Sequence, residues 1–341
     1  MHARRFRFCV VSAVAAAILP QAASADAVED FYHNKTVSMI IGYNVGGGYD
    51  INARIFAKYF PKYIPGHPTI VPQNMGGAGS RRAAAHLESV APKDGSVIGM
   101  VSRDLATEPL LGDAKLDMTK FIWLGSISND ISVCATWHTS PVKTWNDLLT
   151  KEATFGASSG GADTDVSAHL LRNLFGARIK LVTGYPGGSG INLAMERGEV
   201  EGRCGWSWSS VKSRSADWLR DKKINLLIQL GLEKSPDLPD VPLVIDLAKN
   251  QEQRQILRLI FARQVMGRPF LAPPGVPQDR VDALRKAFMD TMADKEFLAD
   301  TDKAKMEITP VAGDKLQELV KEIYATPKEL ADKAAAFIAR K

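Results

Sequence analysis

The chain has 341 residues, of which 45% are hydrophobic and 24% charged, and its formal net charge at neutral pH is +5. Three arginines and no acidic residue lie in residues 1–25, so without that stretch the net charge falls from +5 to +2. So small a charge, with no stripe of Lys and Arg among aromatic residues, argues against nucleic acid as a partner. The length is sufficient for two lobes of ordinary domain size.

The first 25 residues have the pattern of a secretory signal peptide. Three arginines precede an apolar run from Phe8 to Leu19, and Ala23-Ser24-Ala25 forms a small-residue cleavage site, with cleavage after Ala27 as the alternative. The apolar run is shorter than the roughly 18 residues that a membrane span needs. We therefore expect a periplasmic protein whose mature chain begins near residue 26.

A strand, a glycine-rich loop and a helix form the unit around which the chain is organised. Val37–Ile41 is apolar enough for a buried strand, and it leads into the loop from Gly42 to Asp50. Apolar residues at helical spacing follow from Ile51 to Phe60, so Asp50 is expected to cap this helix or lie in its first turn. Three later units have their loops at Gln73–Gly79, Phe155–Asp165 and Gly184–Gly190.

These loops predict anion-binding sites. A helix that begins at a glycine-rich turn leaves several backbone N–H groups unpaired, and the helix dipole favours negative charge there. In an open α/β sheet such loops meet at the carboxyl ends of the parallel strands, where ligands bind.

The remaining pattern predicts two α/β lobes. A helix capped by Ser80 and one capped by Thr144 are expected, and the tail from Gln278 to Lys341 is predicted to form several helices. We predict a bilobal, type II-like periplasmic-binding-protein fold, with residues 26–125 and 230–341 in one lobe, 126–229 in the other, two crossing strands between them and the ligand cleft between the lobes. The other expected strands are Ser96–Val101, Ile131–Thr136, Glu199–Cys204, Ile224–Leu230 and Gln264–Arg268.

The motifs argue against most enzyme classes. No loop completes Gly-x-Gly-x-x-Gly, and no P-loop occurs. Gly156-Ala157-Ser158-Ser159-Gly160 matches a nucleophile elbow, but His169 is the only histidine after it, which argues against an exported hydrolase that uses Ser158. His and Cys are scattered without metal-ligand spacing, so we expect no metal and no cofactor.

Four motifs together resemble a known family. The loop Tyr43–Asp50, the loop Gln73–Gly79, Ala91-Pro92-Lys93-Asp94-Gly95 and Pro239-Asp240-Val241-Pro242, in this order, are similar to the periplasmic solute-binding proteins of tripartite tricarboxylate transporters. The resemblance covers essentially the whole mature chain. It implies a non-enzymatic protein that closes on a small carboxylated solute and delivers it to membrane permease subunits driven by an ion gradient. A sensory protein that presents the same ligand to a receptor is the alternative. We expect a monomer.

The resemblance also implies that two loops, Tyr43–Asp50 and Gly156–Thr164, hold one carboxylate of the solute. The second loop departs from the family pattern, because Ala162 stands where Ser or Thr is usual and Asp163 follows it. An additional carboxylate there would repel a dianion unless it faces away. The predicted ligand-binding residues are Tyr43, Asn44, Gly47, Gly48, Asp50, Asn74, Ser158, Ser159, Thr164, Tyr185 and Arg203.

Some side chains admit two interpretations. Arg203 either pairs with a second carboxylate of the ligand or forms a structural salt bridge. Asp50 either caps the helix, which is the favoured interpretation, or contacts the ligand directly, and both roles can hold if it shapes the loop. Cys134 and Cys204 either form a disulfide or pack as two buried thiols, since their spacing alone does not decide.

Overall fold

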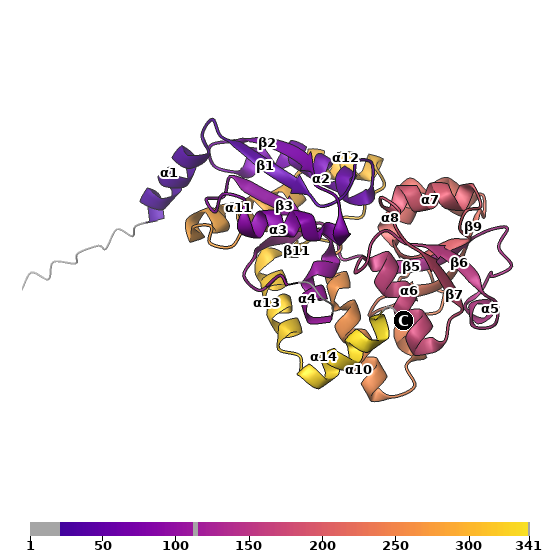
Figure 1. The fold of residues 1–341 in the computed structure, drawn as a ribbon. Helices are drawn as coiled ribbons and strands as arrows, with labels where there is room; N and C mark the ends of the chain where they lie inside the picture. Colours follow the sequence, from indigo (N-terminus) through magenta and orange to yellow (C-terminus); the bar gives the residue numbers. More distant parts are fainter. Residues whose placement is uncertain (1–20, 112–114, 340–341) are drawn as a thin grey trace, which may run out of the picture.

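The computed structural model describes residues 21–111 and 115–339, and it has two α/β lobes, each built on one mixed sheet (Figure 1). The predicted bilobal α/β fold is confirmed. Most of the predicted signal peptide, residues 1–20, lies outside the described residues.

The first sheet has six strands in the order β11-β4-β10-β3-β1-β2. Strand β1 pairs in parallel with β2 and β3, whereas β10 runs antiparallel to β3 and β4, and β11 antiparallel to β4. The parallel strands therefore end at the same edge. The strands are β1 Thr36–Ile41, β2 Thr69–Asn74, β3 Val97–Met100, β4 Ile122–Ser126, β10 Pro269–Ala272 and β11 Val311–Ala312.

Helices cover both faces of this sheet because side chains alternate along its strands. Met39 and Ile41 face the core under α1, α2, α11 and α12, and Ile40 faces the core under α3 and α13. These helices are α1 Gln21–Tyr32, α2 Gly48–Tyr59, α3 Arg81–Ser89, α11 Gln278–Met292, α12 Lys295–Lys303 and α13 Gly313–Tyr324; short turns η1 Phe60–Tyr63, η2 Ala78–Ser80 and η3 Arg103–Ala106 and helix α4 Glu108–Leu111 complete this part.

The second sheet has five strands in the order β7-β6-β8-β5-β9. Strands β6, β7 and β8 are parallel, and β5 runs antiparallel to both β8 and β9. The parallel strands again place their carboxyl ends at one edge. The strands are β5 Ser132–Trp137, β6 Ala153–Gly156, β7 Ile179–Val182, β8 Gly202–Ser207 and β9 Ile224–Leu230.

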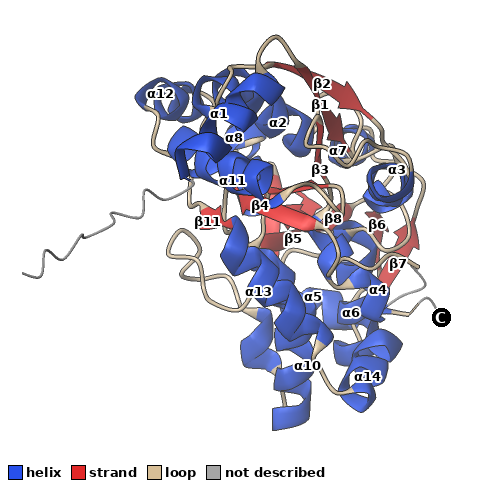
Figure 2. Ribbon diagram, turned by 90° about the vertical axis from the view of Figure 1, so that its left-hand side faces the viewer, coloured by secondary structure: helices blue, strands red, loops and turns tan. Residues whose placement is uncertain are grey.

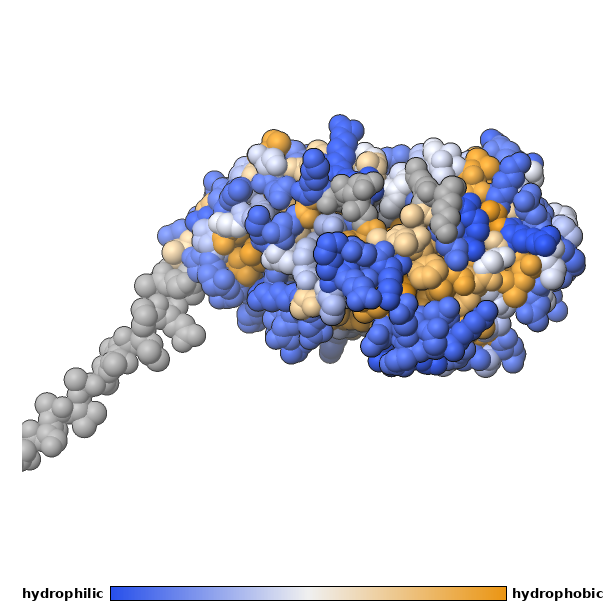
Figure 3. All heavy atoms as spheres, turned by 60° about the horizontal axis from the view of Figure 1, so that its bottom comes forward, coloured by the Kyte–Doolittle hydropathy of each residue, from blue (hydrophilic) through white to orange (hydrophobic). Residues whose placement is uncertain are grey.

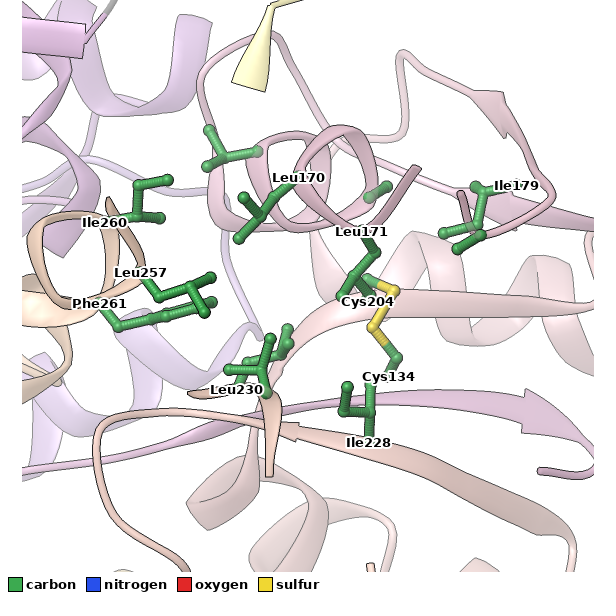
Figure 4. Packing of buried hydrophobic residues seen from close by; sticks show 14 of the residues in the cluster. Cys134, Leu170, Leu171, Ile179, Cys204, Ile228, Leu230, Leu257, Ile260 and Phe261 are labelled. Carbon is green, nitrogen blue, oxygen red and sulfur yellow. A yellow bond between two sulfur atoms is a disulfide. The ribbon is translucent and has the colours of Figure 1, made fainter. Parts of the chain in front are cut away.

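One face of the second sheet packs under α5, α6 and α10, and the other under α7, α8 and α9, so that strands lie between layers of helices (Figure 2). Cys134 on β5 and Cys204 on β8 form a buried disulfide on the face that α6 covers, close to Leu171 (Figure 4). The helices are α5 Trp145–Thr150, α6 Asp163–Phe175, α7 Gly188–Glu196, α8 Trp208–Arg214, α9 Ala216–Arg220 and α10 Gln251–Phe261, with turns η4 Val244–Leu247 and η5 Ala262–Val265.

Two hydrogen-bonded segments, 127–131 and 264–268, connect the sheets. The N–H of Ile127 donates to the carbonyl of Arg268 (3.2 Å), that of Gly267 to Ser128 (2.8 Å) and that of Asp130 to Gln264 (3.1 Å). The chain therefore returns to the first sheet later than residue 230, because η4 and α10 still pack in the core of the second sheet. Helix α14 (Lys328–Ile338) also contacts α4, α6 and α10.

Three local predictions differ from the structure. Residues 264–268 form the second crossing segment, and the strand β10 begins only at Pro269. Strand β8 begins at Gly202 instead of Glu199, because the N–H of Glu199 still bonds to Ala194 at the end of α7. Ser80 does not cap α3 with its side chain; it has a left-handed backbone (φ 73°), and its hydroxyl donates to the carbonyl of Gly42 (2.9 Å).

No helix within residues 21–111 and 115–339 is long and apolar enough to cross a membrane. Figure 3 shows a face on which hydrophilic residues predominate and hydrophobic residues emerge between them.

Candidate ligand-binding site

A cavity of about 260 Å³ lies where the carboxyl ends of the parallel strands from the two sheets face each other. One wall comes from the segments after β1 and β3, and the opposite wall from the segments after β6 and β7 together with β8 and α8. This is the position at which open α/β sheets bind ligands. The polar and aromatic residues of the wall include Tyr43, Asn44, Tyr49, Arg103, Asp104, Ser158, Asp163, Thr164, Asn192, Arg203, Trp206, Ser207, Ser210, Arg214 and Arg268.

The loop after β1 is held in shape by a polar group behind it. Asp50 accepts hydrogen bonds from the N–H of Gly46 (2.8 Å), from Nε of Arg54 (2.9 Å) and from the amide of Asn74 (2.8 Å). The same amide of Asn74 donates to the carbonyl of Tyr43 (2.9 Å). The arrangement keeps the pKa of Asp50 below its usual value: burial acts to raise it, but the three donors outweigh burial. Asp50 therefore stays charged and fixes the loop.

Three helices begin at the cavity without a side-chain cap. Gly47 precedes α2, Ala162 precedes α6 and Gly187 precedes α7, and none of the three supplies a side-chain hydrogen bond to its helix. The first N–H groups of a helix have no intrahelical partner, and the aligned peptide dipoles make that end positive. The backbone therefore contributes positive potential to the cavity at α2 and α7, whereas the first N–H of α6, that of Asp163, already donates to Oδ2 of Asp104 (2.8 Å).

Arg203 on β8 adds a buried guanidinium to the wall. Its Nη1 donates to the carbonyl of Gly188 (2.9 Å) and to Oδ1 of Asn192 (2.7 Å), and its guanidinium carbon lies 4.7 Å from the ring centre of Trp206. Its Nε is buried without a hydrogen-bond partner. Burial lowers the pKa of Arg203, Asp163 acts to raise it, and Arg214 lowers it further. No carboxylate of the described residues forms an ion pair with Arg203.

Asp163 belongs to a buried ion cluster that connects the lobes. Its carboxylate forms ion pairs with Nη2 of Arg103 and Nη2 of Arg263 (3.0 Å), and it accepts hydrogen bonds from the hydroxyls of Ser132 (2.8 Å) and Ser167 (3.1 Å). Burial acts to raise the pKa of Asp163, but the two arginines outweigh it and hold the pKa well below the usual range. The negative charge of Asp163, which lies in the loop that departs from the family pattern, is therefore neutralised inside the protein.

Arg268 on the second crossing segment completes the cluster. It contacts Asp130 (Nη1 to Oδ2, 3.5 Å), donates to the hydroxyls of Ser207 (2.7 Å) and Ser210 (2.9 Å), and stacks on Tyr49 at 4.8 Å. Three buried arginines thus meet three buried aspartates: Arg103, Arg263 and Arg268 with Asp104, Asp130 and Asp163. Among the buried arginines of the described residues, Arg203 alone forms no ion pair with a carboxylate.

The two glycine loops touch across the mouth of the cavity. The side-chain amide of Asn44 donates to the carbonyl of Pro186 (3.2 Å), and the hydroxyl of Ser189 donates to the carbonyl of Gly46 (3.3 Å). Arg214, exposed at the mouth, lies 3.4 Å from the same hydroxyl. These contacts describe a state in which the lobes are closed over the cavity.

The structure brings seven of the predicted ligand-binding residues to the cavity wall: Tyr43, Asn44, Gly47, Gly48, Ser158, Thr164 and Arg203. The other four lie elsewhere. Asp50 and Asn74 support the first loop from behind, and Ser159 lies toward Gly79 of the first lobe. Tyr185 is half-buried, and its ring packs near Gly156 and Ile191 in the core of the second lobe. Its tyrosine ring therefore fills the space beside the glycine instead of lining the cleft.

The cluster residues Arg103, Asp104, Asp130, Arg263 and Arg268 were missed by the sequence analysis. Sequence shows five charged residues in three separate segments, and only the crossing of the chain brings them together. A signal was present for Arg268 alone, because it lies inside the expected strand Gln264–Arg268, where a charged residue requires a partner if the strand is buried.

Within the part of the chain that the structure describes, no histidine forms a hydrogen bond with Ser158. Its hydroxyl lies 3.2 Å from that of Thr164, whereas the imidazole of His169 contacts Asp165 (3.5 Å) and Arg172 (2.8 Å) within the same helix. Within the described residues, no group of three or more His, Cys, Asp or Glu side chains could hold a metal ion.

Comparison with known proteins finds no matching family model. A protein of Cupriavidus necator named "UPF0065 protein in gbd 5'region" is 27% identical over 304 residues, which cover 86% of each chain. A UPF0065 protein from the ttuE-ttuC' intergenic region of Agrobacterium vitis is 26% identical over 334 residues, 95% of this chain and 87% of the relative.

Solved structures share the fold. The periplasmic binding protein BugD superposes with a TM-score of 0.68 at 21% identity, covering 89% of this chain and 98% of its own. MatC of Rhodopseudomonas palustris, solved with bound malate, gives 0.68 at 19% identity over 88% of this chain and 99% of its own. A TctC solute-binding protein from Polaromonas gives 0.59 at 18%, over 89% and 99%. The resemblance seen in the sequence motifs is confirmed by these similarities.

Proposed function

We propose that this chain is an extracytoplasmic solute-binding protein of the TctC/Bug type, which captures a small carboxylate by hinge closure and delivers it to a tripartite tricarboxylate-type membrane transporter. The similarity to periplasmic binding proteins over nearly the whole chain supports the class, and the leader-like first 25 residues support a periplasmic location. We propose that it acts as a monomer.

The observation that carries the proposal is the unpaired charge of Arg203. A buried cation without a counter-ion is unfavourable, because burial removes its hydration and nothing replaces it. Arg203 lines a cavity on which the uncapped starts of α2 and α7 also converge. An anion in that cavity satisfies both features at once, so the cavity selects for negative charge.

Malate is bound to MatC and adipate to Rpa4515 in their solved structures. We infer the same chemical class, carboxylic acids, for the solute of this chain. One carboxylate of the solute is placed against the N–H groups of the loops at Gly47 and Ser158, and a second anionic or polar group against Arg203. A solute held by both lobes then stabilises the state in which the contacts across the mouth are formed, which shifts the open–closed equilibrium to the closed form.

Thermal unfolding of the purified mature protein tests the proposal. The protein is unfolded and refolded to remove any bound solute and is then screened against mono-, di- and tricarboxylates, together with neutral amides of the same length. A solute at 100 times its Kd adds about 2.7 kcal/mol of stability, which is a clear increase in Tm. An anion site would be disproved if the neutral amides stabilised the protein and the acids did not, or if none of the acids raised the Tm.

The Arg203→Gln variant connects the effect to the cavity. Losing a charge-assisted hydrogen bond should raise the Kd of the stabilising acid about 10- to 100-fold, and Arg203→Lys should lose less, since it keeps the charge but not the planar fork. Arg220→Gln is the matched control, because Arg220 is exposed and pairs only with Asp221 (2.8 Å). Uptake of the same acid by cells with and without the gene separates transport from presentation to a receptor.

A further inference from the structure

Asp104 is a buried carboxylate that lines the candidate cavity and is poorly supplied with donors. Its Oδ2 accepts hydrogen bonds from the hydroxyl of Ser102 (2.6 Å) and the N–H of Asp163 (2.8 Å). Its Oδ1 accepts no hydrogen bond, although Nε of Arg263 lies 2.9 Å away in an ion pair. The Asp104 side chain is only 3% exposed. Water therefore does not supply the donors that Oδ1 lacks.

The neighbouring Asp163 is much better stabilised as an anion. Four side chains contact its carboxylate, two of them arginines, and it stands in the first turn of α6, where the helix dipole favours negative charge. Both carboxylates share Arg263. When two close carboxylates share one site, the less stabilised of them takes up the first proton. The contacts identify that group as Asp104.

The groups that face Asp104 come from every element around it. Arg103 lies beside it on η3, Arg263 on η5 and Asp163 on α6. The charge of Asp104 also acts to raise the pKa values of the Tyr43 and Tyr49 phenol groups. Burial raises the pKa of Asp104 to about 6; Arg263 and Arg103 act to lower it and Asp163 to raise it. Glu108 lies on the adjacent α4, paired with Arg81.

We propose that Asp104 is a proton-binding site linked to solute capture: Asp104 takes up a proton when an anionic solute enters the cavity that it lines. The inference rests on the proposed function of this cavity. A negative charge placed in the cavity disfavours a second negative charge on a buried side chain of its wall, so the carboxylate that is already the less stable anion becomes protonated. The proton goes from bulk water to a carboxylate oxygen of Asp104, and the solute stays an anion.

By linkage, an acid whose proton is bound more tightly in the complex makes the complex more stable at lower pH. The Kd of the solute should therefore rise between pH 6 and pH 8, and a single proton limits the slope to tenfold per pH unit. Asp104→Asn imitates the protonated side chain and removes the titration. We expect this variant to bind the solute at pH 8 at least as tightly as the wild-type protein does, with a Kd that does not change between pH 6 and pH 8.

Calorimetry measures the proton directly. The acid that gives the largest Tm increase in the carboxylate panel is titrated at pH 7 into the full-length mature protein, in PIPES and in imidazole buffers of equal ionic strength. Because the two buffers differ in enthalpy of ionisation, the difference in heat gives the protons taken up per solute bound. We expect a value clearly between zero and one for the wild-type protein and zero for Asp104→Asn.

Two control variants locate the proton. Asp294→Asn changes another buried aspartate, the cap of α12 that pairs with Lys62 (2.7 Å) away from the cavity, and His169→Gln removes the buried imidazole of α6. Both should keep the wild-type proton uptake. Uptake that persists in Asp104→Asn, or that disappears in His169→Gln, would overturn the proposal.

An arm without solute keeps the test decisive if Asp104→Asn does not fold or if no acid binds. Carbon-13 NMR of aspartate carboxyl groups in the solute-free wild-type protein should show one carboxyl that titrates between pH 5 and pH 7. Its assignment to Asp104 supports the proton site even where the carboxylate panel fails. An Asp104 carboxyl that titrates near pH 4 refutes it, even where the panel identifies a solute.

Discussion

Asp163 shows how the meaning of one residue depends on its partners. In the sequence it is an acid in a loop that should bind anions, and in the structure it lies between Arg103 and Arg263, which balance its charge. A buried ion pair stabilises the native state little against a hydrophobic alternative, but loss of one partner leaves the others buried and unpaired. Asp163 is therefore more important for stability than for recognition.

Asp163→Asn should lower the free energy of unfolding by about 3–5 kcal/mol, because two buried arginines then share too few carboxylates. Urea unfolding followed by circular dichroism at pH 7 measures it. The comparison variant is Asp332→Asn, which breaks the exposed Lys328–Asp332 pair (2.6 Å) on α14 and should change stability by at most about 0.5 kcal/mol. Equal effects of the two substitutions would contradict the cluster.

The same residue gives a pH dependence. The folded pKa of Asp163 lies below the usual value of 3.8, so its contribution is present above about pH 4 and is lost as the pH falls toward the folded pKa. The stability difference between wild type and Asp163→Asn should therefore shrink steadily below pH 4. Urea midpoints from pH 7 to pH 3 test this, and a difference that stays constant would rule out the titration.

At the scale of elements, local rules predicted well where local contacts decide. Thr144 caps α5 as predicted, and Asp147 completes a capping box with it. The rules failed at Ser80, where a left-handed backbone and a bond to Gly42 replace the cap, and over residues 264–268, where contacts with the other crossing segment replace a sheet. In both places residues distant in sequence determine the conformation.

The disulfide joins β8, which carries Arg203 of the cavity wall, to the adjacent strand β5. Cys204 follows Arg203 on β8 and is bonded to Cys134 on β5. Replacing both cysteines by Ala should destabilise the fold by about 4 kcal/mol on the chain-entropy account, given their separation of 70 residues. Thermal unfolding with and without reductant checks the effect. A Tm of the double variant equal to that of the oxidised protein would show that the bond adds no stability.

At the scale of the molecule, closure requires a close approach at Gly48. A Cβ there would lie 2.6 Å from Oγ of Ser210 in the opposite lobe and 3.4 Å from Nη2 of Arg268. Gly48→Ala should leave the two lobes folded but weaken solute binding several-fold, because only the closed state meets the clash. Calorimetric Kd values measure the loss.

The double variant Gly48→Ala/Ser210→Ala is the internal control, since it removes the nearest clashing atom. It should recover part of the affinity, with Ser210→Ala alone as the reference. Additive losses in the double variant would show that the weaker binding of Gly48→Ala has another cause.

The fold could be predicted because it follows from patterns along the chain. Apolar strands, glycine loops and amphipathic helices alternate, and they determine two layered α/β lobes. The site was predicted in part for the same reason: Tyr43, Gly48, Ser158 and Thr164 follow directly on strands whose ends must meet. The ion cluster could not be predicted, because Arg103, Asp163 and Arg263 meet only after both crossings are in place.

Much of the cavity wall consists of segments that leave the strands and add no rung to either sheet, whereas Arg203 and Trp206 pair within β8. Each segment can therefore be exchanged separately while strand register and helix packing persist. The sequence of these segments can therefore change while the fold persists, which agrees with the 18–21% identity at which this chain shares its fold with four solved structures. If the cavity-lining segments of this chain replace those of a relative, the preference for a solute should be transferred with them.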